Sequence, residues 1–169
     1  EELGIDEIRI GLLLSVAQTM GIISQPIMGN LSDTKGRKVV MVIGTASVGL
    51  LSIGLAVMAH SSIASIDSSF VMIGLWAIII GKGAFTFSLH HIYLAAALDV
   101  SGAKMQSSIV AIMYGSGIIS TFSPYLAGLL ADKYGYYSAF LFGGIILIAA
   151  AFVLLFLKIT KPQVNSQPH

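Results

Sequence analysis

The sequence predicts an all-α, polytopic membrane protein with five transmembrane helices, and three observations predict it. Hydrophobic residues make up 56% of the 169 residues and charged residues only 10%, with a mean hydropathy of +0.89, whereas a soluble domain usually carries about 25% charge. The apolar residues form five long runs, at about 8–29, 39–59, 70–96, 106–130 and 136–157. Each run is continuous, whereas the strands of a membrane β-barrel would alternate over about ten residues.

Each run is long enough to form a transmembrane helix. At about 1.5 Å per residue, it covers a hydrocarbon core of about 30 Å, so we expect the lipid bilayer to surround nearly the whole chain. The net charge of +1 gives no indication of nucleic-acid binding, and the sequence contains no cysteine for disulfides or thiolate metal sites. The chain begins without a methionine or a basic segment, so we expect no signal peptide and a start inside a longer protein.

Basic residues are divided unevenly between the two ends of the predicted bundle. With alternating helices, Arg9 and Lys133 fall on one side. The other side holds Lys35, Arg37, Lys38, Lys104, Lys158 and Lys161. Because lysine and arginine are enriched in cytoplasmic loops, we expect an outer N-terminus and a cytoplasmic C-terminus, in the plasma membrane. The polar segment 161–169 is expected to be a disordered cytoplasmic tail.

The stretch GNLSDTKGRK, from Gly29 to Lys38, separates the first two runs. Pro26, Gly29 and the pair Ser32–Asp33 predict a helix end followed by a tight turn. Gly36 allows a positive φ without steric cost, and the next helix then begins at Arg37–Lys38. A hairpin with cytoplasmic bases would explain the basic residues, but it would not explain Asp33 or the spacing of the two glycines.

The pattern G-x-L-S-D-x-x-G-R-K resembles the signature loop of the major facilitator superfamily of secondary transporters. The matching positions are Gly29, Leu31, Ser32, Asp33, Gly36, Arg37 and Lys38. The resemblance covers essentially the whole chain. It implies that residues 1–160 are a partial transporter domain, forming most of a six-helix half-bundle. It also implies transport of a small solute by alternating access, coupled to an ion gradient.

The resemblance gives the loop residues a gating role. It implies that Asp33 lies against the positive N-terminal end of a helix in the opposite half of the transporter and pairs with an arginine such as Arg37. This contact would hold the cytoplasmic side closed in the outward-facing state. Gly29 would let the two halves approach closely.

Five spans with an outer N-terminus match either helices two to six or helices eight to twelve of a twelve-helix transporter. In WAIIIGKGAF, Ile78 stands where the family's fourth helix usually carries an arginine. SPYLAGLLADKYGYYSAF resembles an eleventh helix and its external turn, and the chain ends in a short polar tail. We therefore assign helices eight to twelve. The N-terminal half of the transporter is then a missing partner, without which no transport is expected.

Lys82 is the one ionisable residue deep in a predicted span, where a lysine costs roughly 2.5–3.5 kcal/mol on insertion scales. On a helical wheel Lys82, Thr86, His90 and Tyr93 fall within about 80° of each other. This stripe predicts a lining for the substrate path, with Lys82 either attracting an anionic substrate or pairing with a carboxylate, and with His90 as a titrating group. The alternative is that Lys82 is buried against carbonyls or acids of the missing half.

Two further helices carry candidate polar groups. Gln18 and Gln25 share a face of the first helix with Ser15, and they would hydrogen-bond either the substrate or a neighbouring helix. Tyr114 lies in the fourth run among several serines, and Pro124 frees a backbone carbonyl there. A bend at this point would serve either as a moving gate or as a static kink. Glycines recur in the second, third and fourth runs, which predicts close helix packing.

Helical membrane proteins also include two other functional classes, intramembrane enzymes and non-transporting subunits or receptors. An intramembrane enzyme would need an acid–base or metal constellation, but the sequence contains no HExxH or GxSxG motif. His90 and His91 are adjacent, so they do not have the i, i+4 spacing of helical metal ligands. No enzyme activity, metal or cofactor is therefore expected. A non-transporting subunit or receptor that reuses the fold is the remaining alternative.

Overall fold

The computed structural model describes residues 7–60, 68–101 and 105–157, and these residues form helices and short turns without a strand. The helices are α1 (Glu7–Lys35), α2 (Arg37–Ala59), α3 (Ser68–Val100), α4 (Gln106–Gly115), α5 (Gly117–Ser120), α6 (Ser123–Tyr134) and α7 (Tyr136–Phe156). The predicted all-α, polytopic class is therefore confirmed. Lys104, Lys158 and the predicted tail 161–169 lie outside the described residues.

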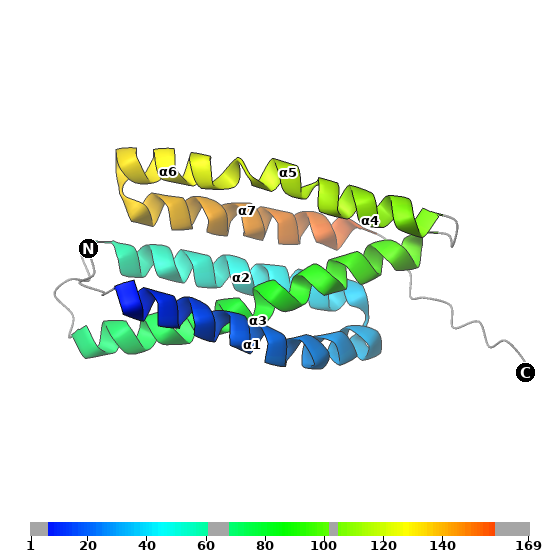
Figure 1. The fold of residues 1–169 in the computed structure, drawn as a ribbon, viewed down its shortest axis with the longest axis horizontal. Coiled ribbons are helices and arrows are strands. Elements are labelled where there is room, and N and C mark those ends of the chain that lie inside the picture. Colours follow the sequence, from blue (N-terminus) through cyan, green and yellow to red (C-terminus); the bar gives the residue numbers. More distant parts are fainter. Residues whose placement is uncertain (1–6, 61–67, 102–104, 158–169) are drawn as a thin grey trace, which may run out of the picture.

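Four helical segments are long and apolar enough to cross a membrane. They are Ile10–Lys35, Arg37–Ala59, Val71–Val100 and Tyr136–Phe156. The fifth expected span, 106–130, is instead divided into α4, α5 and α6, which follow one another along the top of Figure 1. The count of five unbroken helices is thus not reproduced, although α4–α6 together run the length of the bundle.

The sequence explains the two breaks in this crossing. Ser116 lies between α4 and α5 and is flanked by Gly115 and Gly117, and glycine is a weak helix former. Pro124 has no N–H to donate to the carbonyl four residues earlier, and that residue is Ser120, where α5 ends. The hydropathy run is continuous across both breaks, so it did not reveal them.

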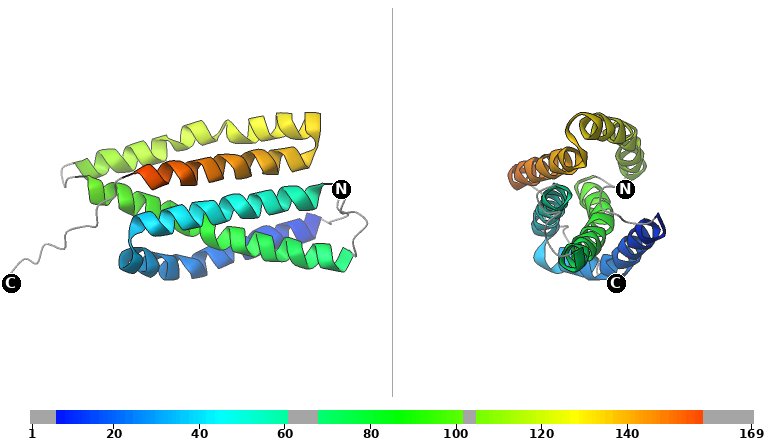
Figure 2. Two further views of the ribbon diagram at one scale, coloured as in Figure 1. Left: turned by 180° about the vertical axis from the view of Figure 1, so that it is seen from behind. Right: turned by 90° about the vertical axis from the view of Figure 1, so that its left-hand side faces the viewer.

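The helices form a curved layer in the order α1, α3, α2, α7 and α4–α6. α2 packs mainly along α7 and α3, and α1 packs mainly along α3. The end-on view in Figure 2 shows α3 in the middle of the bundle between α1 and α2, with α7 beside α2 and α4–α6 beyond α7. One apolar core joins α2 and α3 through Val40, Met41, Ile92 and Ala96.

Glycines allow several of these helices to approach closely, as expected. A Cβ on Gly83 of α3 would lie 2.7 Å from the backbone carbonyl carbon and Cα of Ala17 on α1. On the other side of α2, a Cβ on Gly144 of α7 would lie 3.0 Å from the carbonyl oxygen of Gly49. Gly115 and Gly117 differ, because a Cβ there would meet no atom within 4 Å in the described part of the chain.

The ends of α1 and α3 lie beyond the expected positions. α1 continues through Pro26 and Gly29 to Lys35, and α3 continues to Val100, although the apolar runs end near residues 29 and 96. Helical hydrogen bonding does not require apolar side chains, so a helix can continue past the apolar run. The turn between α1 and α2 is therefore a single residue, Gly36, with a φ of 99°.

Candidate functional site

The turn at Gly36 brings the end of α1 next to the start of α2. Its positive φ is a conformation that favours glycine, and its N–H donates to the carbonyl oxygen of Ser32 at 3.1 Å. The Ser32 side chain is almost fully buried, and its hydroxyl has no hydrogen-bond partner in the described chain. A Cβ on Gly29 would meet no described atom within 4 Å, so this glycine lies on an open side of α1.

Arg37, the first residue of α2, binds two carboxylates. Its Nε donates to an Oδ2 of Asp99 near the end of α3, and its Nη2 lies 3.5 Å from the Asp99 Oδ1. Its Nη1 also lies 3.3 Å from an Oδ1 of Asp33, one helical turn earlier. The side chains of Arg37 and Asp99 are only 18% and 16% exposed, whereas that of Asp33 is 66% exposed.

The expected contact between Asp33 and Arg37 is therefore present, but the more buried partner of Arg37 is Asp99. No role was assigned to Asp99 from the sequence. One signal was available: Asp99 follows the third apolar run, on the same side of the predicted bundle as the signature loop.

Lys38 connects the loop to a third helix end. Its Nζ donates to the carbonyl oxygen of Leu155 at 2.6 Å, in the last turn of α7. A cation at this position satisfies a carbonyl that has no partner inside the helix and interacts favourably with the helix dipole. Arg37 and Lys38 thus join the start of α2 to the ends of both α3 and α7.

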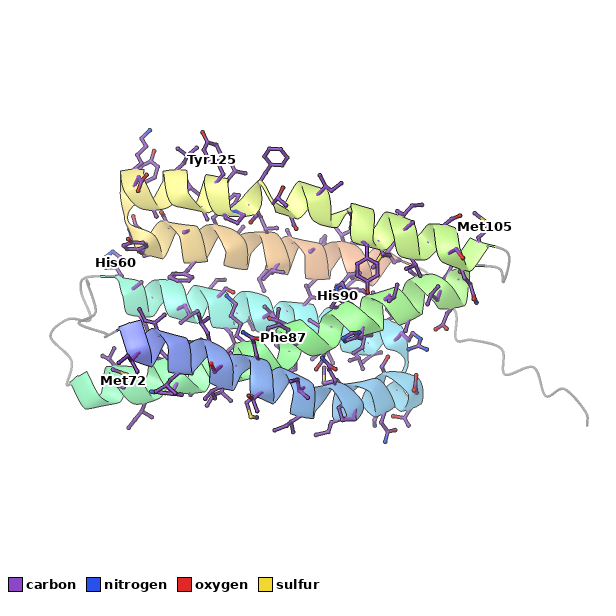
Figure 3. The ribbon with its side chains drawn as sticks, in the orientation of Figure 1. His60, Met72, Phe87, His90, Met105 and Tyr125 are labelled. Carbon is purple, nitrogen blue, oxygen red and sulfur yellow. The ribbon has the colours of Figure 1, made fainter. Side chains whose placement is uncertain are left out.

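A groove of about 680 Å³ lies beside this charged end of the bundle, between α2, α3, α4–α5 and α7. Its lining is mainly apolar, with polar contributions from His90, Tyr93, Ser116 and Ser120. The Tyr93 hydroxyl hydrogen-bonds the buried Thr45 hydroxyl on α2. Figure 3 shows His90 on the half of α3 that approaches α4, and its ring lies edge-on to Tyr114 with centroids 5.9 Å apart.

The predicted stripe on α3 is divided between the groove and the middle of the helix. His90 and Tyr93 line the groove, and Tyr114 contacts His90. Thr86 and Lys82 lie on the same face of α3, about one and two turns before the groove lining begins at His90. Lys82 is half-buried, and no acid, hydroxyl or carbonyl of the described residues binds its ammonium group.

The other candidate polar residues are not brought to this groove. Gln18 and Gln25 lie on α1, which is separated from the groove by α3. Hydroxyls of the broken crossing bond carbonyls of their own helical turn, from Ser116 to Met113 at 2.7 Å and from Ser120 to Gly117 at 2.6 Å. Over residues 7–60, 68–101 and 105–157, no three His, Asp or Glu side chains are grouped as metal ligands would be.

Comparison with known proteins gives one family. The family model described as Major Facilitator Superfamily matches residues 1–169. Comparisons with curated proteins and with solved structures find no match. The family match agrees with the signature loop, and it spans all the helices described above.

Proposed function

Because this chain belongs to the major facilitator superfamily, whose members are transporters, we propose that it takes part in secondary active transport of a small solute by alternating access, driven by an ion gradient. The observation that carries this proposal is the ion-pair cluster of Asp33, Arg37 and Asp99 at one end of the bundle. Asp99 holds Arg37 against α3, which leaves Asp33 largely exposed at the turn. An exposed carboxylate on a fixed turn is suited to a contact that forms and breaks in each transport cycle.

In this proposal Asp33 contacts the N-terminal end of a helix in the other half of the transporter. Such a contact with a helix dipole contributes about 0.3–1 kcal/mol when exposed and up to about 2 kcal/mol when partly buried. An energy of this size closes the cytoplasmic side without trapping the protein there. The open surface at Gly29 supports a close approach of the second half.

The five crossings then correspond to helices eight to twelve of a twelve-helix transporter. Ile78 in place of an arginine, together with the sequence around Pro124, supports this assignment. The protein would lie in the plasma membrane, with the Gly36 turn in the cytoplasm. Lys82 and the groove residues His90, Tyr93 and Tyr114 would lie along the substrate path, and Gln18 and Gln25 would contact the substrate or the other half from α1.

Replacing Asp33 tests the gating role. We expect Asp33→Asn in the full-length gene product to lower the initial rate of solute uptake about two- to thirty-fold, the range that corresponds to losing about 0.3–2 kcal/mol. Uptake of a panel of labelled solutes into proteoliposomes measures the rate, and immunoblotting of the membranes measures insertion, which should not change. Equal uptake by the variant and the wild type would contradict the gating role. An absence of uptake by the wild type would contradict transport itself.

A further inference from the structure

One face of α3 connects the middle of the span with the groove. From the middle of the helix outward, this face carries Lys82, Thr86, His90, Tyr93, Ala97 and Val100. The last four line the groove. The spacings of three and four residues place all six side chains on one side of a helix. α1 packs against another side of α3, where Gly83, Ala84 and Ser88 meet it.

Lys82 brings a charge to this face, and none of the residues 7–60, 68–101 and 105–157 supplies a partner for it. It lies near the middle of the membrane-crossing segment Val71–Val100, where a charged side chain almost always faces a cavity or a partner. The only acid on α3 is Asp99, which lies seventeen residues away, or about 25 Å along the helix, and is bound by Arg37. Of the other acids in the described helices, Glu7 is the first residue of α1, and Asp33 and Asp132 lie in the last turns of α1 and α6.

The groove supplies an apolar surface on the same face. Its volume of about 680 Å³ lies within the range of about 300–1,000 Å³ that is usual for small-molecule sites. Two methionines, Met41 and Met113, are among its lining residues, and methionine adapts readily to apolar ligands of different shape. His90 begins the groove eight residues after Lys82, or about 12 Å along the helix.

We propose that the transported solute is an amphipathic organic anion, whose single charged group pairs with Lys82 and whose apolar body lies along α3 toward the groove at His90 and Tyr93. This inference rests on the proposed transport function and specifies its substrate class. One cation that has no partner among the described residues matches one negative charge. A polar sugar would leave the apolar lining of the groove without a matching apolar surface. A dianion would leave its second negative charge without a cation on this face.

Three probes test this inference by separating the negative charge from the apolar body. 2-Naphthalenesulfonate carries the charge and the apolar body, 2-naphthalenesulfonamide carries only the body, and methanesulfonate carries only the charge. Binding to the purified full-length protein is measured by the rise in its melting temperature over a range of ligand concentrations, since a ligand that binds the folded state stabilises it by RT ln(1 + [L]/Kd). We expect naphthalenesulfonate to bind at least tenfold more tightly than either of the other two compounds.

Variants of Lys82 assign the charge preference to one residue. Lys82→Met should weaken naphthalenesulfonate binding at least tenfold and leave sulfonamide binding unchanged, whereas Lys82→Arg should retain the anion preference. Lys133→Met is the matched control, because Lys133 is exposed in the last turn of α6 and its loss should change neither affinity.

Two results would overturn the inference. The first is equal affinity of the wild type for the sulfonate and the sulfonamide, which decides the question even if Lys82→Met does not fold. The second is unchanged sulfonate binding in Lys82→Met. Either result can coexist with uptake of neutral or cationic solutes at a rate that Asp33→Asn lowers. In that case the proposed transport function holds, and only the proposed substrate class is wrong.

Discussion

Arg37 is bound by two carboxylates that differ in burial and therefore in their contribution to the stability of the fold. Asp99 and Arg37 are mostly shielded from water, whereas Asp33 is 66% exposed. A hydrogen bond to a charged group contributes about 1.5–3 kcal/mol, and an exposed i, i+4 ion pair only about 0.3–0.5 kcal/mol. The structural attachment of α2 to α3 therefore depends on Asp99, and Asp33 is free for a second contact.

Replacing each acid by its uncharged isostere separates these roles. We expect Asp99→Asn to lower the free energy of unfolding by about 1–3 kcal/mol, because Arg37 loses its shielded counter-charge. Asp33→Asn should lower it by less than about 0.5 kcal/mol. Unfolding of the purified full-length protein in detergent, followed by circular dichroism, measures both changes. An Asp99→Asn protein as stable as the wild type would show that this ion pair does not hold the two helices together.

The charged residues of the site differ in how far the sequence could predict them. The contact of Arg37 with Asp33 and the positive φ of Gly36 both follow from residues within one turn of each other. Asp99 is 62 residues from Arg37, and Lys38 is 117 residues from the carbonyl that it binds. These contacts depend on which helix ends meet in space, and no local pattern contains that information.

At the scale of helices, the contact between α1 and α3 depends on small residues and hydroxyls. The Ser24 hydroxyl on α1 lies 2.6 Å from the Ala84 carbonyl oxygen and 2.7 Å from the Ser88 hydroxyl on α3. Gly83 brings the two backbones into contact at Ala17, two turns before Ser24 on α1. In a bilayer such close backbone approach and interhelical hydrogen bonds replace the hydrophobic effect as sources of helix association.

A single methyl group at Gly83 should therefore disturb this crossing. The added Cβ of Gly83→Ala would lie 2.7 Å from backbone atoms of Ala17, which cannot rotate away as a side chain would. We expect a loss of about 1–3 kcal/mol in the free energy of unfolding, as for other overpacked sites. Gly128→Ala in α6 is the control, since its Cβ would meet no described atom within 4 Å. Equal stability of the two variants would contradict the backbone contact.

The broken crossing α4–α6 shows a limit of hydropathy as a predictor. Hydropathy measures transfer to lipid, and residues 106–130 form an uncharged, mainly apolar run. Whether the helix continues depends on backbone hydrogen bonds, which Gly115, Gly117 and Pro124 weaken at particular points. The residues that cause the breaks were visible in the sequence, and Pro124 was expected to free a carbonyl, but the continuous apolar run favoured one helix.

For the molecule as a whole, an all-α polytopic bundle could be predicted from the sequence, but the order of neighbouring helices could not. Each crossing follows from the length and hydropathy of its own segment. In the structure α1 lies mainly against α3 and not against α2, its neighbour in sequence. Helix order depends on which faces fit, such as Gly83 on Ala17. The groove was not predictable for the same reason, because four crossings contribute to its lining.

The orientation of the molecule in the membrane can be tested at its two ends. The Gly36 turn lies at the end of the bundle with Lys35, Arg37 and Lys38, and the turn between α6 and α7 lies at the other. This chain contains no cysteine, so Thr34→Cys and Lys133→Cys, both at exposed positions, add single thiols to it.

In intact cells that express an otherwise cysteine-free full-length protein, a membrane-impermeant maleimide should label Lys133→Cys. It should label Thr34→Cys only after the cells are permeabilised, because lysine and arginine favour the cytoplasmic side. Labelling of Thr34→Cys in intact cells, with protection of Lys133→Cys, would reverse the orientation. It would also place the Asp33 contact at the outer face, so that the same cluster would close the outward-facing side of the transporter.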